Sequence, residues 1–158
     1  MHQSLLKLFQ RDILNLYKEI ELYQDESQLW EILDGTNNSG GNLALHLMGN
    51  LNTYFGNNLG NMGYVRNRES EFSDKNIPKE ILLKSIEEVN QVVSKVLENL
   101  TNEQMKANYP ENVLGYEMTT EYFLIHLHGH LTYHTGQINY HRRFLVNRVQ
   151  LTENSLTV

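Results

Sequence analysis

Residues 82–100 read LLKSIEEVNQVVSKVLENL, which is the clearest helical pattern in the chain. Apolar residues recur there at alternating spacings of four and three, at Leu82, Ile86, Val89, Val93, Val96 and Leu100. This spacing gives an α-helix one continuous apolar face, as in a helix packed within a bundle. Because proline is tolerated as the first helical residue, we expect this helix to begin at Pro78.

Three further stretches have helical patterns of similar length. Residues 4–23 place one apolar face on Leu5, Phe9, Ile13, Leu16 and Ile20. A second helix is expected over about residues 40–58, with Ser39 as its N-cap and Gly60 as its stop. The longest is expected over about residues 120–147, and a short helical turn is expected near Trp30.

These four helices, with no convincing strand, predict an all-α four-helix bundle. The connection between the second and third helices, about residues 59–77, is too long for a tight hairpin. We therefore interpret it as a crossover along the bundle. The chain is expected to form a single domain over residues 1–150, followed by a loose tail over residues 151–158.

Composition narrows the class of protein. The chain has 158 residues, of which 40% are hydrophobic and 20% charged, values ordinary for one globular domain. Its formal net charge is −6 and it has no basic block, which argues against nucleic acid and anionic membranes as partners. It has no cysteine, no signal-peptide pattern and no apolar run of membrane-spanning length. We therefore expect a cytoplasmic protein.

Five of the seven histidines lie in residues 126–141, HLHGHLTYHTGQINYH. At about 100° per residue, one narrow stripe beside the apolar face holds His126, His130, His134, Gln137 and His141. His128 falls elsewhere on the helix, on the expected solvent face. A similar polar stripe on the second helix holds Asn42, His46, Asn50, Thr53 and Asn57. If the two stripes pack together, they line a polar cleft with imidazoles inside it.

His130 and His134 are one helical turn apart on the same face, close enough to share a cation. A third imidazole from another helix would complete a site of three nitrogens with open positions for water or substrate. Such a site suits zinc or nickel, and also iron, cobalt or copper, better than calcium or magnesium. The alternative is a set of buried histidines satisfied by hydrogen bonds to neighbouring polar side chains. Leu131 replaces the glutamate of HExxH, which excludes a zincin protease.

Residues 130–138, HLTYHTGQI, together with the upstream His46, resemble the DinB-like superfamily. Residues 66–72, RNRESEF, resemble the polar linker of one branch of it. The likeness spans about residues 5–146. It implies an up-down-down-up bundle with a long crossover between helices two and three, and a divalent metal held by His46, His130 and His134.

The resemblance also implies a class of activity, because known members are mostly low-molecular-weight thiol S-transferases, including bacillithiol- and mycothiol-dependent enzymes. Four residues are candidate contacts for a small-molecule thiol or electrophile: Arg66, Arg68, Gln137 and Arg142. Each arginine has an alternative role in an ion pair with a nearby carboxylate such as Glu69, Glu71 or Asp74. His126, Asn50 and His141 are candidates for positions around the metal ligands.

A metal on three imidazoles would lower the pKa of a thiol or water bound to it. The absence of a carboxylate from either histidine stripe mildly favours thiol chemistry over hydrolysis. The sequence thus predicts a metal-dependent thiol transferase. Two alternatives remain: a non-catalytic metal-binding or ligand-binding bundle, and a metal-dependent hydrolase. The family resemblance further suggests a homodimer.

Overall fold

The structure is a computed structural model that describes residues 2–155, with side chains described as far as residue 146. Its long helices are α1 (His2–Glu21), α2 (Gly40–Leu51), α4 (Lys79–Asn99) and α6 (Thr120–Ser155). A π-helix, η2 (Asn52–Asn57), continues α2. The shorter elements are a 3-10 helix, η1 (Glu26–Trp30), and the helices α3 (Arg68–Ser73) and α5 (Asn102–Lys106).

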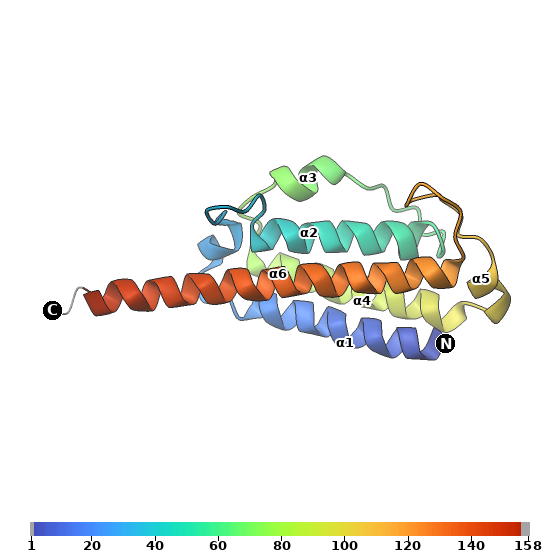
Figure 1. Cartoon of the computed structure of the whole chain (residues 1–158), viewed down its shortest axis with the longest axis horizontal. Helices are drawn as coiled ribbons and strands as arrows, with labels where there is room; N and C mark the ends of the chain where they lie inside the picture. Colours follow the sequence, from blue (N-terminus) through green and yellow to red (C-terminus); the bar gives the residue numbers. More distant parts are fainter. Residues whose placement is uncertain (1, 156–158) are drawn as a thin grey trace.

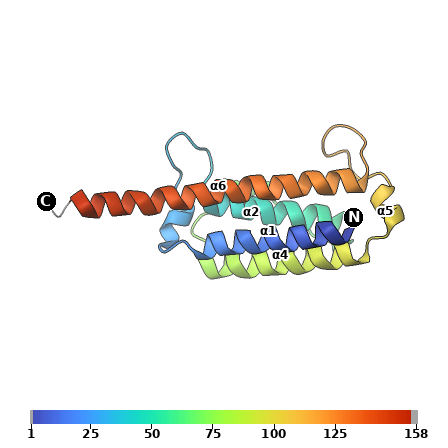
Figure 2. The same cartoon turned by 60° about the horizontal axis from the view of Figure 1, so that its bottom comes forward.

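The four long helices form a bundle with up-down-down-up topology, as predicted (Figure 1). α1 and α6 run in one direction, and α2 and α4 run in the other (Figures 1 and 2). α1 and α2 each pack against both α4 and α6 and contact each other only weakly, so they lie diagonally across the core. This arrangement puts α2 and α6, the two helices with polar stripes, side by side.

A long crossover, residues 58–78, follows from this topology. Because α2 and α4 run in the same direction, the chain must return along the bundle between them. Figure 1 shows the returning chain passing outside α2, and the short helix α3 within this chain segment packs against α2. The crossover is fastened by Asn42 of α2, whose Nδ2 donates hydrogen bonds to the carbonyl oxygens of Glu71 (3.0 Å) and Asp74 (2.9 Å).

The core agrees closely with the predicted apolar faces. All five residues predicted for the first helix are buried, and so is the complete series predicted for the third helix. Trp30 is buried on η1, where it lies against Gly41 so closely that a Cβ there would collide with the indole. Within residues 2–155, no helix combines the length and apolar character needed to cross a bilayer.

Two helix ends differ from the prediction. Ser39 does cap α2, accepting a hydrogen bond from the backbone N–H of Asn42 (3.1 Å), but the last turns before Asn58 are π-helical. α6 continues to Ser155 instead of ending at Asn147, and it projects beyond the other helices in both ribbon views (Figures 1 and 2). No proline or glycine follows Gly136 to end it. Of the predicted loose tail, residues 156–158 lie outside the described residues.

Candidate metal centre

Three histidines from two helices converge between α2 and α6. His46 comes from the middle of α2, and His130 and His134 come from successive turns of α6. One nitrogen from each ring lies within 4.8 Å of the others. The Nε2 atoms of His46 and His130 are 3.2 Å apart. The structure therefore brings together the three residues predicted as metal ligands, in a cluster that could hold a metal ion.

A buried ion pair from the crossover orients His46. The Nδ1 atom of His46 lies 3.0 Å from Oε2 of Glu71, and the Glu71 side chain is only 5% exposed. Arg66 forms two hydrogen bonds with the same carboxylate: Nε donates to Oε1 (2.6 Å), and Nη2 donates to Oε2 (2.8 Å). A carboxylate at Nδ1 favours the tautomer with its proton there, which leaves the Nε2 lone pair facing the other histidines.

Gly49 is what lets Glu71 approach α2 so closely. It lies on α2 one turn after His46, and a Cβ at this position would collide with the Glu71 carboxylate. The observed position of the crossover therefore requires a residue without a side chain at position 49.

Gln137 orients His134 in a similar way. The Nδ1 atom of His134 donates to Oε1 of Gln137 (2.6 Å), and Nε2 of Gln137 donates to the Tyr133 hydroxyl (3.3 Å). Nε2 of His134 is consequently the nitrogen with an available lone pair. The third ring, His130, has a buried Nδ1 with no hydrogen-bond partner among the described residues.

The electrostatics of the cluster keep the rings neutral. Burial lowers the pKa of His46 and of His134 below the ordinary value. Burial, with the neighbouring His134 and His46, lowers the pKa of His130 to about 3. Neutral imidazole is the form that binds metal. The Nε2 lone pairs of His46 and His134 are directed toward one point, and Nε2 of the neutral His130 ring faces the same point. This arrangement fits a divalent transition metal better than a network of hydrogen bonds among the rings.

The residues predicted to surround the ligands have different positions. Asn50 is buried on α2 one turn beyond His46, and its Oδ1 has no hydrogen-bond partner in the part of the chain that the structure describes. His126 is exposed and stacks on Phe123, with ring centroids 6.0 Å apart. His141 is buried away from the cluster: its Nε2 donates to the carbonyl oxygen of Glu31 (2.8 Å), and its Nδ1 lies 2.7 Å from the Tyr23 hydroxyl.

The arginines predicted as substrate contacts also differ from one another. Arg66 is engaged with Glu71, the pairing that the sequence offered as its alternative role. Arg142 pairs with Glu19 of α1, 2.8 Å from Nη2 to Oε2. Arg68 begins α3 and is exposed. Of the three, only the Arg68 guanidinium has no carboxylate contact among the described residues.

His128 does not face solvent, which corrects the prediction. Its Nε2 lies 2.7 Å from Oδ2 of the buried Asp12 on α1, and its ring packs edge-on against Phe9 at 5.3 Å. The reason is that α6 packs against α1 as well as α2, so it has two buried faces where the helical wheel allowed for one.

The contact of Glu71 with a histidine of the cluster is what sequence reasoning missed. The sequence indicated that neither helical stripe carries a carboxylate, and the structure supplies one from the crossover instead. The available signal was the RNRESEF stretch itself, where Arg66 and Glu71 stand five residues apart in an otherwise aperiodic connection.

The chain matches one family model by sequence, and its fold is similar to that of solved structures. A family model described as "Protein of unknown function (DUF1572)" matches residues 9–153. A DinB-like protein from Bacillus cereus ATCC 10987 shares the fold, with a TM-score of 0.69 and 19% identity over 90% of this chain and 91% of that chain. YfiT from Bacillus subtilis, described as "a probable metal-dependent hydrolase with an unusual four-helix bundle topology", has a TM-score of 0.69 and 19% identity over 91% of this chain and 87% of its own. No curated protein matches the sequence. The DinB-like resemblance is therefore confirmed for the fold.

Proposed function

We propose a function for this chain, which belongs to DUF1572, a family of proteins of unknown function: it binds one divalent transition metal and joins a low-molecular-weight thiol to an electrophile. The proposed ligands are His46, His130 and His134. The observation that carries the proposal is the convergence of three neutral imidazoles, one of them backed by the buried Glu71. Zinc or nickel fits this donor set best, followed by iron, cobalt or copper.

The surrounding protein prepares the centre in two ways. Glu71 and Gln137 fix the tautomers of His46 and His134, so that their Nε2 atoms face the metal position. Burial keeps all three rings unprotonated near neutral pH. A metal bound there would supply positive charge that lowers the pKa of a thiol.

The proposed reaction is a simple substitution. The thiol sulfur forms a bond to the electrophilic carbon, the leaving group departs with the bonding electron pair, and the thiol proton passes to solvent. The chain itself contains no cysteine, so the thiol must come from outside the chain, which is consistent with a small-molecule thiol. No general base from the protein is required once the thiol is ionised.

A metal-dependent hydrolase is the second candidate, and the fold shared with YfiT favours it. Hydrolysis is supported less well because water activation commonly uses a carboxylate base. The carboxylate that contacts this cluster, Glu71, has both oxygens engaged by Arg66 and His46. A non-catalytic metal-binding or ligand-binding bundle is the third candidate.

Elemental analysis of protein purified without added metal tests the metal assignment. We expect about one transition-metal ion per chain, and we expect His130→Ala to lose it because three ligands fall to two. Full metal occupancy in the His130→Ala variant would show that the site is wrongly assigned.

The metal-loaded protein should then be screened for conjugation of small thiols, including cysteinyl-sugar thiols, to alkyl and aryl halides and epoxides. A parallel screen should follow hydrolysis of esters and amides. Conjugation that disappears with His130→Ala supports the transferase. Hydrolysis alone would favour the second candidate, and binding without either reaction would favour the third.

A further inference from the structure

Two of the three proposed ligands have an outer hydrogen-bond partner, and the third does not. Nδ1 of His46 faces Oε2 of Glu71, and Nδ1 of His134 faces Oε1 of Gln137. Nδ1 of His130 is buried without a hydrogen-bond partner among the described residues. A histidine that binds metal through one ring nitrogen carries its proton on the other, and that N–H is almost always donated to an acceptor. The centre therefore lacks one acceptor, at His130.

Asn50 on α2 carries the complementary group. It is only 7% exposed, and its Oδ1 has no donor in the described part of the chain. A buried amide oxygen without a donor is costly and uncommon. Among the described residues of α2 and α6, the buried side-chain atoms without a partner are Oδ1 of Asn50 and Nδ1 of His130. The undescribed side chains of α6 begin at residue 147, about 25 Å along the helix from His130, too far to contact it.

The packing of α2 against α6 brings these two residues together. The two helices lie side by side and run in opposite directions (Figures 1 and 2). The step from His46 to Asn50 along α2 therefore runs in the same direction as the step from His134 to His130 along α6. Because each Cα–Cβ bond tilts toward the N-terminus of its own helix, the side chains of Asn50 and His130 lean toward each other.

The position of the ring proton decides whether the two atoms can pair. The Nε2 atoms of His46 and His130 are 3.2 Å apart, so a hydrogen bond between them needs a proton on one. Glu71 holds the proton of His46 on Nδ1, so in a cluster without a cation the shared proton belongs to Nε2 of His130. Nδ1 of His130 is then an acceptor and cannot pair with the Asn50 oxygen. Cation binding through Nε2 requires the other tautomer, with the proton on Nδ1.

We propose that Asn50 is the positioning residue of His130: its Oδ1 accepts the Nδ1–H of the metal-binding tautomer. This inference rests on the metal-binding part of the proposed function. Asn50 stabilises only the ligand form of His130, and it thereby completes a set in which each ligand ring has its own outer acceptor.

Two substitutions and a matched control test this role through metal affinity. Asn50→Leu has a similar size and no acceptor, and it should weaken Zn²⁺ binding by about 10–100-fold in a competition titration with a chelator. Asn50→Asp keeps an acceptor and should bind Zn²⁺ at least as tightly as the wild type. Unchanged affinity in Asn50→Leu, or an equal loss in both variants, would overturn the proposal.

Asn90→Leu is the control. Asn90 lies on α4 and also has a buried Oδ1 without a partner among the described residues, but α4 packs mainly against α1, α2 and η2. Its substitution should leave the Zn²⁺ affinity unchanged. A loss equal to that of Asn50→Leu would mean that any buried amide affects the metal, which would overturn the proposal.

The stability of the metal-free protein separates positioning from a structural role. Because the Asn50 oxygen has no donor in that state, Asn50→Leu should leave the midpoint of thermal unfolding unchanged or raise it when a chelator is present. A clearly lower midpoint would show that Asn50 supports the fold itself and would overturn the proposal.

The ring protons give the most direct measurement. In protein saturated with Co²⁺, the N–H of each histidine ligand should give a paramagnetically shifted proton resonance that disappears in D₂O. We expect three such resonances in the wild type. Asn50→Leu should shift or remove one of them, and Glu71→Gln should change a different one. Three unchanged resonances in Asn50→Leu would overturn the proposal.

These measurements involve no thiol chemistry, so they separate this inference from the proposed function. A wild type that binds metal but conjugates no thiol would overturn the transferase alone, and the titration and spectra would still decide the role of Asn50. Metal binding that is insensitive to Asn50→Leu would overturn that role alone. A wild type that binds neither Zn²⁺ nor Co²⁺ would overturn both.

Discussion

Glu71 is the carboxylate of the crossover that contacts the candidate metal centre, at Nδ1 of His46. Replacing it with glutamine keeps its size but removes the charge that Arg66 and His46 share. Outer-shell partners of this kind typically contribute about 10–100-fold to metal affinity. We therefore expect Glu71→Gln to weaken metal binding by about that factor in a competition titration with a chromophoric chelator.

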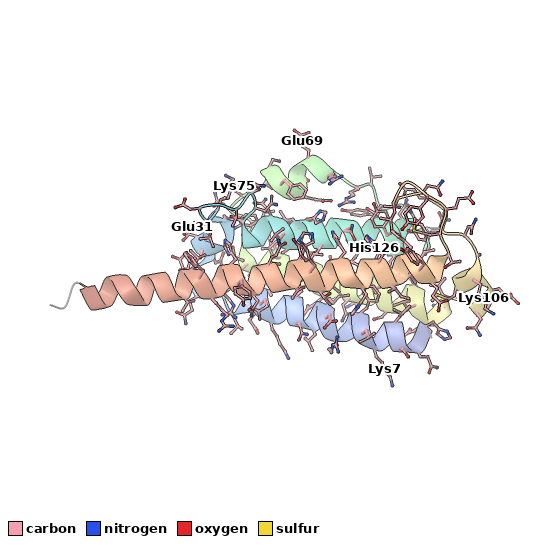
Figure 3. The ribbon with its side chains drawn as sticks, viewed as in Figure 1. Lys7, Glu31, Glu69, Lys75, Lys106 and His126 are labelled. Carbon is pink, nitrogen blue, oxygen red and sulfur yellow. The ribbon has the colours of Figure 1, made fainter. Side chains whose placement is uncertain are left out.

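Glu69 provides the matched control for this substitution. It lies on the same short helix, and Figure 3 shows it pointing away from the bundle. Glu69→Gln should leave the metal affinity unchanged. Equal effects of the two substitutions would mean that Glu71 acts only through the general charge of the crossover.

The buried histidines make the stability of the metal-free protein depend on pH. The unfolded chain binds protons on these rings below about pH 6.5, whereas the folded His130 has a pKa of about 3. Acid therefore favours unfolding, and stability should increase as the pH rises from about 3 to 6.5 and then level off. His46, His134 and His141 have pKa values lowered in the same direction and contribute with the same sign.

Thermal unfolding in the presence of a chelator, followed by circular dichroism between pH 4 and 8, measures this dependence. His130→Gln should flatten the curve between pH 4 and 6.5. A wild-type melting temperature that stays constant or rises on acidification would contradict the neutral, buried state of these rings.

The convergence of the three histidines could be predicted because helical spacing fixes which residues share a face. The contact of Glu71 with His46 could not, because Glu71 lies in an aperiodic connection whose position depends on tertiary contacts such as those of Asn42. The sequence placed Asn42 beside the cleft, whereas the structure uses its amide to hold the crossover. Polarity was predictable from the stripe, but the partner of each polar group was not.

On the scale of elements, α6 joins two interfaces. One face meets α2 at the metal centre, and another meets α1 through His128 and Asp12. His128→Ala should leave the metal content unchanged while lowering the free energy of unfolding by about 1–3 kcal/mol, because the buried Asp12 loses a hydrogen-bond partner. Chemical denaturation measures the loss and elemental analysis measures the metal. Loss of metal in this variant would mean that the two faces are not independent.

Element ends were predictable where a local signal exists. Ser39 predicts the start of α2 because its hydroxyl can satisfy a free backbone N–H, and the structure contains that hydrogen bond. The π-helical turns of η2, which lie against α4, have no comparable sequence signal. The predicted end of α6 at about Asn147 is too early, because no glycine or proline follows Gly136 and the helix continues to Ser155.

For the whole molecule, the order of the helices and the length of the crossover together define the topology. The crossover length alone indicated that helices two and three do not form a hairpin, and the family resemblance supplied the up-down-down-up arrangement. Packing of the two polar stripes required α2 and α6 to be neighbours, which the structure confirms. The cytoplasmic location stays a prediction.

We propose that the whole molecule is a homodimer, as the family resemblance implies. Light scattering during size-exclusion chromatography should give about twice the chain mass of 18.5 kDa. A mass near 18.5 kDa over the whole accessible concentration range would show a monomer instead.

The distance along the chain between the proposed ligands has a consequence for the integrity of the molecule. His46 and His130 are 84 residues apart, and the loop between α5 and α6 separates them in sequence. A metal bound to both would act as a reversible cross-link between the two parts of the chain. A protease cut in that loop, for example near Gly115, would then yield two fragments that remain associated while metal is bound and separate more readily when a chelator removes it.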